Sequence, residues 1–313
     1  FEHGDGSGYV SDNATNDFFS NTVGANTLKS GLFSYFGTLG YDYQSRYGID
    51  LTLRRDASYR FTDSNKWGTF YSVGARWNIN NEAFMDDVEF VDALKLRASY
   101  GKTGNQEIVN ADGLFKYFSA ATLTQSTFAT GTGYGSQNSL FLNQIGNSSL
   151  KWETIYQSNI GVDFEAFNSR LRGSVDAYLK TTEDLFQNRP ISAINAQTSI
   201  RANIGSLENR GIDFQAEYDI LRSPTGFNFT FGLVGNYNKQ EIKEIPTPED
   251  EVIYGNYTGI REGGVIQEFY VIPYVGVNPD NGNLQFLDED GNVTENPNPD
   301  TDRRWTGENV YPD

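Results

Sequence analysis

The stretch LFSYFGTLGYDYQSRYGIDLTLR, residues 32–54, alternates apolar and polar side chains with a period of two on each side of a short turn. Phe33, Tyr35 and Leu39 lie on one side of the first run, and Ile49 continues the pattern in the second. Side chains of a strand point to opposite faces in turn, so the pattern predicts two antiparallel strands with one apolar face each. Such strands suit a transmembrane β-barrel, where the apolar face meets lipid and the polar face meets a water-filled lumen.

The same alternation recurs along the chain and predicts eight strands of about ten residues, as membrane strands require. They are expected at residues 31–43, 47–56, 70–80, 94–100, 154–165, 171–180, 211–221 and 227–238. The phase of the alternation predicts that the following side chains face lipid: Phe33, Tyr35, Leu39, Ile49, Leu51, Leu53, Val73, Val162, Phe214 and Phe231. The predicted fold class is therefore all-β, an antiparallel transmembrane β-barrel segment.

Short and long connections alternate for most of the chain. Short turns are expected at residues 44–46, 167–170 and 222–226, and long polar loops at 101–150, 181–210 and 239–313. Outer-membrane barrels have short periplasmic turns and longer extracellular loops, so the three long segments are predicted to be extracellular. The link at residues 81–93 is longer than a turn and breaks a perfect alternation.

Composition excludes several classes of function. The 313 residues carry 24 Lys and Arg against 41 Asp and Glu, a formal charge of −17, which argues against binding to nucleic acid. The chain has no cysteine, so it has neither disulfides nor thiolate metal sites, and His3 is its one histidine. A Ser-His or Cys-His catalytic pair in the body of the chain and a multi-histidine zinc site are therefore excluded.

Two groups of residues are candidate ligand sites. Asp288, Asp290 and Asn292 gather oxygen ligands around a glycine turn as calcium loops do, although the full spacing and closing Glu of an EF-hand are missing and a plain acidic turn is favoured. Among the aromatic residues of the long loop, Tyr117, Phe118 and Tyr134 are candidates for stacking on sugar rings, and packing of the loop onto itself is the alternative.

Five ordered blocks then carry a resemblance to a known family. Residues 34–61, 67–85, 94–106, 150–185 and 203–218 closely resemble segments of the SusC/RagA-type TonB-dependent outer-membrane transporters, in the order of that family. Examples are LKLRASYGKTGNQ at residues 94–106 and NIGSLENRGIDFQAEY at residues 203–218. Residues 265–305 are also similar to the family.

The resemblance implies that residues 1–313 belong to the second, C-terminal half of a barrel of about 22 strands, with the plug domain and the other strands outside this sequence. It implies a protein of the bacterial outer membrane that imports oligosaccharides or peptides with energy from TonB, which would act through regions absent here. It also implies a SusD-like surface lipoprotein as partner and contact with outer-membrane lipid and lipopolysaccharide. Neither catalysis nor a cofactor is expected, with calcium as the one metal considered.

Two other interpretations remain open at the level of the residues. A soluble or surface all-β glycan-binding protein or glycosidase would bury its apolar strand faces against a second sheet and carry an acid pair in its loops. A complete small structural outer-membrane barrel would pair its first strand with its last. The fragment interpretation predicts instead that residues 31–43 and 227–238 do not pair.

Overall fold

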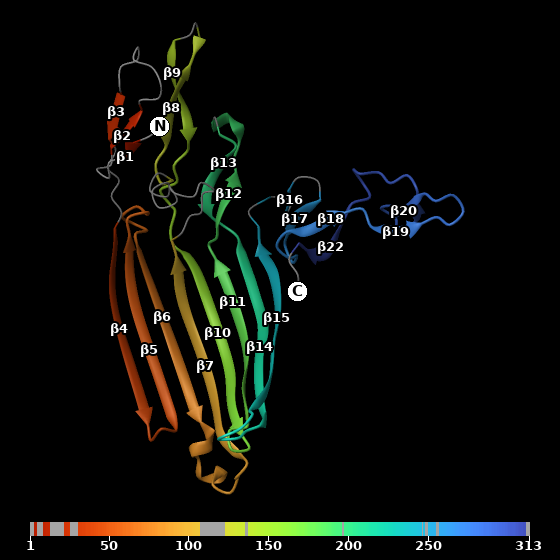
Figure 1. Ribbon diagram of the computed structural model, residues 1–313. Coiled ribbons are helices and arrows are strands. Elements are labelled where there is room, and N and C mark those ends of the chain that lie inside the picture. The colour runs from red at the N-terminus through yellow and green to blue at the C-terminus, as the bar shows by residue number, and fades with distance from the viewer. Residues whose placement is uncertain are drawn as a thin grey trace.

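The computed structural model describes residues 3–4, 9–12, 22–25, 31–106, 123–134, 137–195, 197–245, 247, 250–254 and 257–310. One long antiparallel sheet dominates this part of the chain, and smaller sheets gather near one end of it (Figure 1). Among the described residues, no helix has the length and apolar character needed to cross a bilayer.

The main sheet has eight strands in the order β15-β14-β11-β10-β7-β6-β5-β4. They are β4 (Leu32–Tyr43), β5 (Tyr47–Ser58), β6 (Trp67–Asn78), β7 (Val91–Asn105), β10 (Glu153–Ala166), β11 (Leu171–Glu183), β14 (Ser206–Leu221) and β15 (Phe229–Glu244). Each of the eight predicted strands is present, and each pairs with its sequence neighbours in this sheet. The predicted all-β, antiparallel architecture is confirmed.

The sheet is open. β4 and β15 form its two opposite edges and do not pair with each other, as the fragment interpretation predicts. The interpretation as a complete small barrel is therefore wrong for this structure, because it requires that pair. The soluble interpretation also fails, because the apolar side chains of the sheet are exposed rather than buried against a second sheet.

The open edges lead to the first testable prediction. Residues 1–313 expressed alone are expected to aggregate rather than insert into a membrane, because unpaired N–H and C=O groups at β4 and β15 would each cost several kcal/mol in hydrocarbon. Heat-modifiable migration in detergent and size-exclusion chromatography measure this. A stable, detergent-soluble monomer of this segment would contradict it.

The strand register separates the two faces of the sheet. Ile49 lies opposite Tyr41 and Ala75, and the row continues through Ala98, Ile160, Ala177, Ile212 and Tyr237. We call the face that carries this row the apolar face and the opposite one the polar face. All ten side chains predicted to share a face lie on the apolar face. Nine are at least 38% exposed and Val162 is half-buried, so none sits in a closed core.

The short connections lie together at one end of the main sheet, which we call the lower end (Figure 1). In the β4–β5 turn, Gln44 and Ser45 have positive φ angles, and the Asp42 carboxylate accepts a hydrogen bond from the Ser45 N–H at 2.8 Å. In the β10–β11 turn, residues 167–169 also have positive φ angles, which lets the chain reverse tightly. The β6–β7 link contains the 3₁₀ turns η1 (Ile79–Asn81) and η2 (Ala83–Met85).

Strands at the upper end run further than predicted. β7, β11 and β15 continue into the segments expected to be loops, and β14 begins inside one. On the apolar face these extensions carry Lys102, Thr181, Glu208 and Glu241, which pair across neighbouring strands. The alternation of apolar and polar residues therefore ends before the hydrogen-bonded pairing of the strands ends. For this reason the sequence pattern placed the upper strand ends too early.

Smaller sheets occupy the long connections. The first hairpin pairs β8 (Thr127–Thr132) with β9 (Asn138–Gln144), and the second pairs β12 (Phe186–Pro190) with β13 (Ser199–Asn203), with η6 (Ala193–Asn195) between them. After β15, one sheet joins β16 (Glu251–Tyr254), β17 (Thr258–Arg261), β18 (Glu268–Val271) and β22 (Arg304–Asn309), and another joins β19 (Tyr274–Val277), β20 (Leu284–Leu287) and β21 (Val293–Thr294). Near the N-terminus, β1 (His3–Gly4), β2 (Tyr9–Asp12) and β3 (Thr22–Ala25) pair with one another.

The buried core lies where the upper loops meet the main sheet. It consists of Phe61, Phe70, Leu123, Leu150, Trp152 and Phe186. The Trp152 ring lies 5.6 Å from the ring of Phe61 and 5.3 Å from that of Phe70, and its Nε1–H donates to the Lys66 carbonyl oxygen at 3.1 Å. Phe70 belongs to the polar face, because it is paired with Arg54 and alternates with the exposed Tyr71. The loops are thus anchored onto the polar face.

Candidate functional site

The polar face of the main sheet carries a network of ion pairs centred on Arg97 of β7. Its guanidinium donates to both carboxylate oxygens of Asp163 at 2.9 and 2.8 Å, and to Asp176 at 2.9 Å. Lys95 lies 2.8 Å from the same Asp163 carboxylate. The network spans β7, β10 and β11, so three strands contribute to one charged cluster.

The register explains how Arg97 reaches two strands away. Gly161 of β10 lies directly between Arg97 and Asp176 in the same row. A Cβ atom at Gly161 would lie 2.2 Å from the Asp176 Oδ1 and 2.9 Å from an Arg97 Nη atom. The absence of a side chain at this position is therefore what lets the arginine pass over β10 and meet Asp176.

Two further arginines of the polar face are paired in the same way. Arg172 of β11 lies 2.7 Å from Glu217 and 3.1 Å from Asp219, both on the neighbouring β14. Arg76 of β6 lies 2.5 Å from the Asp42 carboxylate on β4, and its side chain passes over Gly48 of the intervening β5. Charged groups that pair with each other across strands are suited to a hydrated lumen wall rather than to acid-base catalysis.

Hollows lie along this face of the described sheet, and two of them bear on ligand binding. The lower one, of about 790 Å³, is lined mainly by polar groups, among them Asn78, Arg97, Arg172 and Glu217. The upper one, of about 530 Å³, lies between the β12–β13 hairpin, the upper ends of β14 and β15, and the β16–β18 strands. Its lining is largely aliphatic, with Leu185, Leu207, Ile242, Ile245, Val252, Ile260 and Ile266, and it includes the charged residues Arg201 and Glu244.

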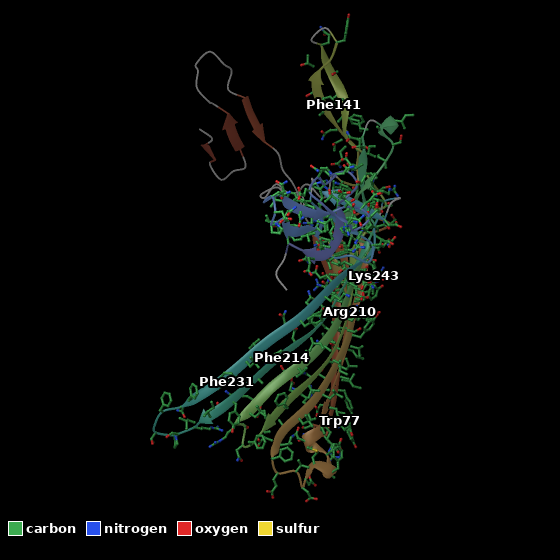
Figure 2. The ribbon with its side chains drawn as sticks, turned by 90° about the vertical axis from the view of Figure 1, so that its right-hand side faces the viewer. Trp77, Phe141, Arg210, Phe214, Phe231 and Lys243 are labelled. Carbon is green, nitrogen blue, oxygen red and sulfur yellow. The ribbon has the colours of Figure 1, made fainter. Side chains whose placement is uncertain are left out.

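Of the aromatic residues predicted to contact a ligand, Tyr134 is described by the structure and does not line either hollow. Tyr134 lies fully exposed at the turn between β8 and β9, and Phe128, Leu140 and Phe141 of the same hairpin are exposed as well. Figure 2 shows Phe141 on this hairpin, far above the main sheet. Tyr117 and Phe118 lie outside the described residues. A role for these aromatic residues in ligand binding stays a prediction.

The calcium candidate is a closed turn that follows β20. The Asp288 carboxylate accepts a hydrogen bond from the Asn292 N–H at 2.7 Å, and Gly291 has a φ of +83°. Asp290 and Asn292 lie in the same turn. In the described part of the chain, no three His, Asp or Glu side chains gather as a metal site requires. Calcium binding by Asp288, Asp290 and Asn292 stays a prediction.

Comparison with known proteins decides the family. The family described as "TonB dependent receptor-like, beta-barrel" matches residues 2–313. The chain belongs to the TonB-dependent receptors. TonB-dependent receptor P39 of Formosa agariphila is 37% identical over 265 residues, and TonB-dependent receptor SusC of Bacteroides thetaiotaomicron is 32% identical over 289 residues. These alignments cover 85% and 86% of this chain but 24% and 28% of the relatives, so the chain spans about a quarter of their length.

A solved structure supports the same assignment. The RagAB peptide importer in its closed-closed state superposes on this receptor with a TM-score of 0.79 at 28% sequence identity, over 96% of this chain and 32% of that one. This receptor is therefore of the SusC/RagA type and is a β-barrel protein of the outer membrane. These relatives are receptors and importers rather than enzymes, and the apolar face of the sheet is the one that such a barrel turns to lipid.

The receptor also holds polar clusters in its later loops that the sequence analysis missed. The side-chain amides of Asn278, Asn281 and Asn283 donate to the Glu295 carboxylate at 2.6, 2.9 and 2.8 Å. These hydrogen bonds, that of Asn283 first, hold the pKa of Glu295 below its usual value. The run of asparagines in this loop was the available signal, but Glu295 lies 12 residues beyond Asn283, and only the fold shows that they meet.

Cysteine labelling measures the orientation of the receptor, and residues 1–313 contribute no native cysteine to the background. In the full-length receptor, a cysteine replacing Tyr134 is expected to react with a membrane-impermeant maleimide in intact cells, whereas one replacing Asn168 is not, because the two sites lie at opposite ends of the sheet. Asn168 should label after the outer membrane is opened. Equal labelling of both sites in intact cells would contradict the predicted placement of the short turns in the periplasm.

Proposed function

We propose that the intact protein imports oligosaccharides or peptides across the outer membrane, and that residues 1–313 supply barrel wall and extracellular loops. The observation that carries this proposal is the two-faced sheet: an exposed apolar face suits lipid, and a polar face lined with the Arg97, Arg172 and Arg76 ion pairs suits a hydrated lumen. No catalytic step is part of the proposal, because these carboxylates are engaged by arginine and lysine.

The proposal includes two partners. A SusD-like surface lipoprotein would cover the upper end, where the long connections gather, and TonB would act through regions of the protein outside this chain. The similarity to RagAB, a complex whose published description is that of a peptide importer, supports a two-component arrangement. The 32% identity to SusC supports the same assignment.

The upper hollow favours a peptide over a glycan as cargo. Its described lining contains aliphatic side chains and no aromatic ring, whereas sugar rings are commonly bound by stacking on aromatic side chains. Arg201 and Glu244 place one charge of each sign beside the aliphatic wall, which suits the backbone termini or charged side chains of a peptide.

Deletion of the gene tests the function, and uptake of two labelled cargo classes tests the substrate. Cells that carry the full-length receptor are expected to accumulate a fluorescent oligopeptide mixture in a TonB-dependent manner, and the deletion strain is expected to lose this uptake. Uptake of a fluorescent oligosaccharide but not of the peptides would support import and show that the cargo is an oligosaccharide rather than a peptide. Unchanged uptake of both classes in the deletion strain would contradict import.

Affinity purification of the tagged receptor tests the lipoprotein partner.

A further inference from the structure

On four strands of the main sheet the upper border of the apolar face begins with a cation, whereas on β11 its first charged residue is Glu183. On β5, β7, β14 and β15, the first charged residue above the apolar stretch is Arg55, Lys102, Arg210 and Lys239, respectively. All four belong to the apolar face, because they pair with or alternate with its members. The whole chain has a formal charge of −17, so this placement does not reflect a general excess of basic residues.

The cations are closest together at the β14–β15 pair. Arg210 and Lys239 lie directly opposite each other, and Ile212 and Tyr237 form the next apolar pair beneath them. Lys243 lies four residues further up β15, beyond Glu241 on the same face. Figure 2 shows Lys243 and Arg210 above Phe214 and Phe231 along these strands. Two cations thus lie directly above an exposed apolar surface. An amphiphilic anion needs both, the cations for its charged group and the apolar surface for its acyl chains.

The positive charges of this pair are poorly matched within the protein. The Arg210 side chain is 51% exposed, and its nearest carboxylate, Glu241, is 3.7 Å away. Lys239 is exposed and has no carboxylate within 4 Å among the described residues. By contrast, Arg97 on the polar face has two carboxylates within 2.9 Å. Arg210 and Lys239 therefore keep charge that an external anion can neutralise.

We propose that Arg210 and Lys239, with Lys243 beside them, bind a phosphate group of lipopolysaccharide, the phosphorylated glycolipid of the outer leaflet. A guanidinium grips phosphate through two parallel hydrogen bonds, and an ammonium adds a point charge. The acyl chains of the same molecule lie on the apolar wall that begins at Ile212 and Tyr237. That wall commits the site to a lipid rather than to free phosphate.

Arg55 and Lys102 are further positions along the same border and already have partial partners. The Arg55 guanidinium lies 5.1 Å from the centre of the Trp67 ring, and the Lys102 ammonium lies 5.6 Å from the centre of the Tyr156 ring. Such cation–π contacts hold a cation at an interface without neutralising it. The β14–β15 pair is the principal site because two cations face each other there.

Lipid binding by the purified full-length receptor tests the proposal. Native mass spectrometry in detergent would follow titration with bisphosphorylated lipid A, with the same lipid after removal of its phosphates, and with inorganic phosphate. The double variant R210A/K239A is expected to bind bisphosphorylated lipid A about 30-fold more weakly, since each basic residue near an anionic lipid surface contributes about fivefold. Dephosphorylated lipid A and inorganic phosphate are each expected to bind far more weakly to the unmodified receptor.

Two single variants sharpen the test. Lys180 lies on the polar face, and it pairs with Asn209, the residue next to Arg210 on β14. K180A is therefore the matched control and is expected to leave lipid binding unchanged. Glu241 competes for Arg210 and Lys243, at 3.7 and 2.5 Å, so E241Q is expected to strengthen binding a few-fold without removing a cation. Heat-modifiable migration confirms folding of each variant.

Three results would overturn the assignment. The first is binding by folded R210A/K239A within twofold of the unmodified receptor, or an equal loss in K180A. The second is equal binding of lipid A with and without phosphate, which would leave only acyl-chain contacts. The third is weaker binding by E241Q, which would mean that the carboxylate, rather than the cations, contacts the lipid through a bridging metal ion.

Discussion

Replacing Trp152 by alanine is expected to destabilise the upper end of the receptor by about 3–5 kcal/mol, the usual cost of removing a buried tryptophan from a core. Trp152 is 7% exposed, lies between the rings of Phe61 and Phe70, and donates its Nε1–H to the Lys66 carbonyl oxygen. The variant therefore loses ring packing and one of the two hydrogen bonds that the Lys66 carbonyl oxygen accepts, while the one from the Ser58 N–H remains. In the full-length receptor, hydrogen exchange of residues 58–70 and 150–154 measures the change.

The matched control is Phe141→Ala, which removes a large aromatic side chain that is half exposed on the β8–β9 hairpin. A substitution at such a site is expected to change stability by no more than about 0.5 kcal/mol. Exchange in the lower half of β4 and β5 should stay unchanged in both variants, because the core touches only the upper end. Equal exchange in the Trp152 variant and the unmodified receptor would show that the cluster does not anchor the loops.

Replacing Leu51 by lysine is expected to destabilise the barrel by about 2–4 kcal/mol, the cost of a basic residue at the bilayer midplane. Leu51 lies on the apolar face between Leu39 and Val73, four residues from both Tyr47 and Arg55 along β5. Tyr47 lies next to the β4–β5 turn at the lower end, with its ring 6.4 Å from that of Trp77, and Arg55 lies at the upper border of the apolar face, so Leu51 lies near the middle of that face. Urea unfolding of the full-length receptor in lipid vesicles measures the effect.

Thr52→Lys is the matched control for this variant. Thr52 is the next residue of β5 and points to the polar face, where it pairs with Thr38 and Ser72. A lysine there enters a hydrated wall that already holds arginine and lysine, so the change in the free energy of unfolding is expected to be small. A loss at Thr52 as large as that at Leu51 would contradict the assignment of the two faces.

Local alternation was enough to predict the strands and their faces. The phase of the apolar residues placed four side chains that are far apart in the chain on one face: Phe33, Leu51, Val162 and Phe214. This works because side chains of a strand alternate between its two faces whichever strand is the partner. Turn lengths likewise predicted antiparallel neighbours. The upper strand ends were placed too early, since residues such as Lys102 and Glu241 continue the ladder after the apolar signal ends.

The sequence by itself therefore determined the features that depend on local periodicity, namely the strands, their two faces and the turns. The order of the sequence blocks also indicated the family. The tertiary structure alone decided which side chains meet. Arg97 reaches Asp176 because Gly161 leaves a gap between them, and Arg210 faces Lys239 because of the β14–β15 register. Trp152 meets Phe61 and Phe70 only after two loops fold back onto the sheet. Each of these contacts depends on pairing between distant segments, which the period of a single strand does not encode.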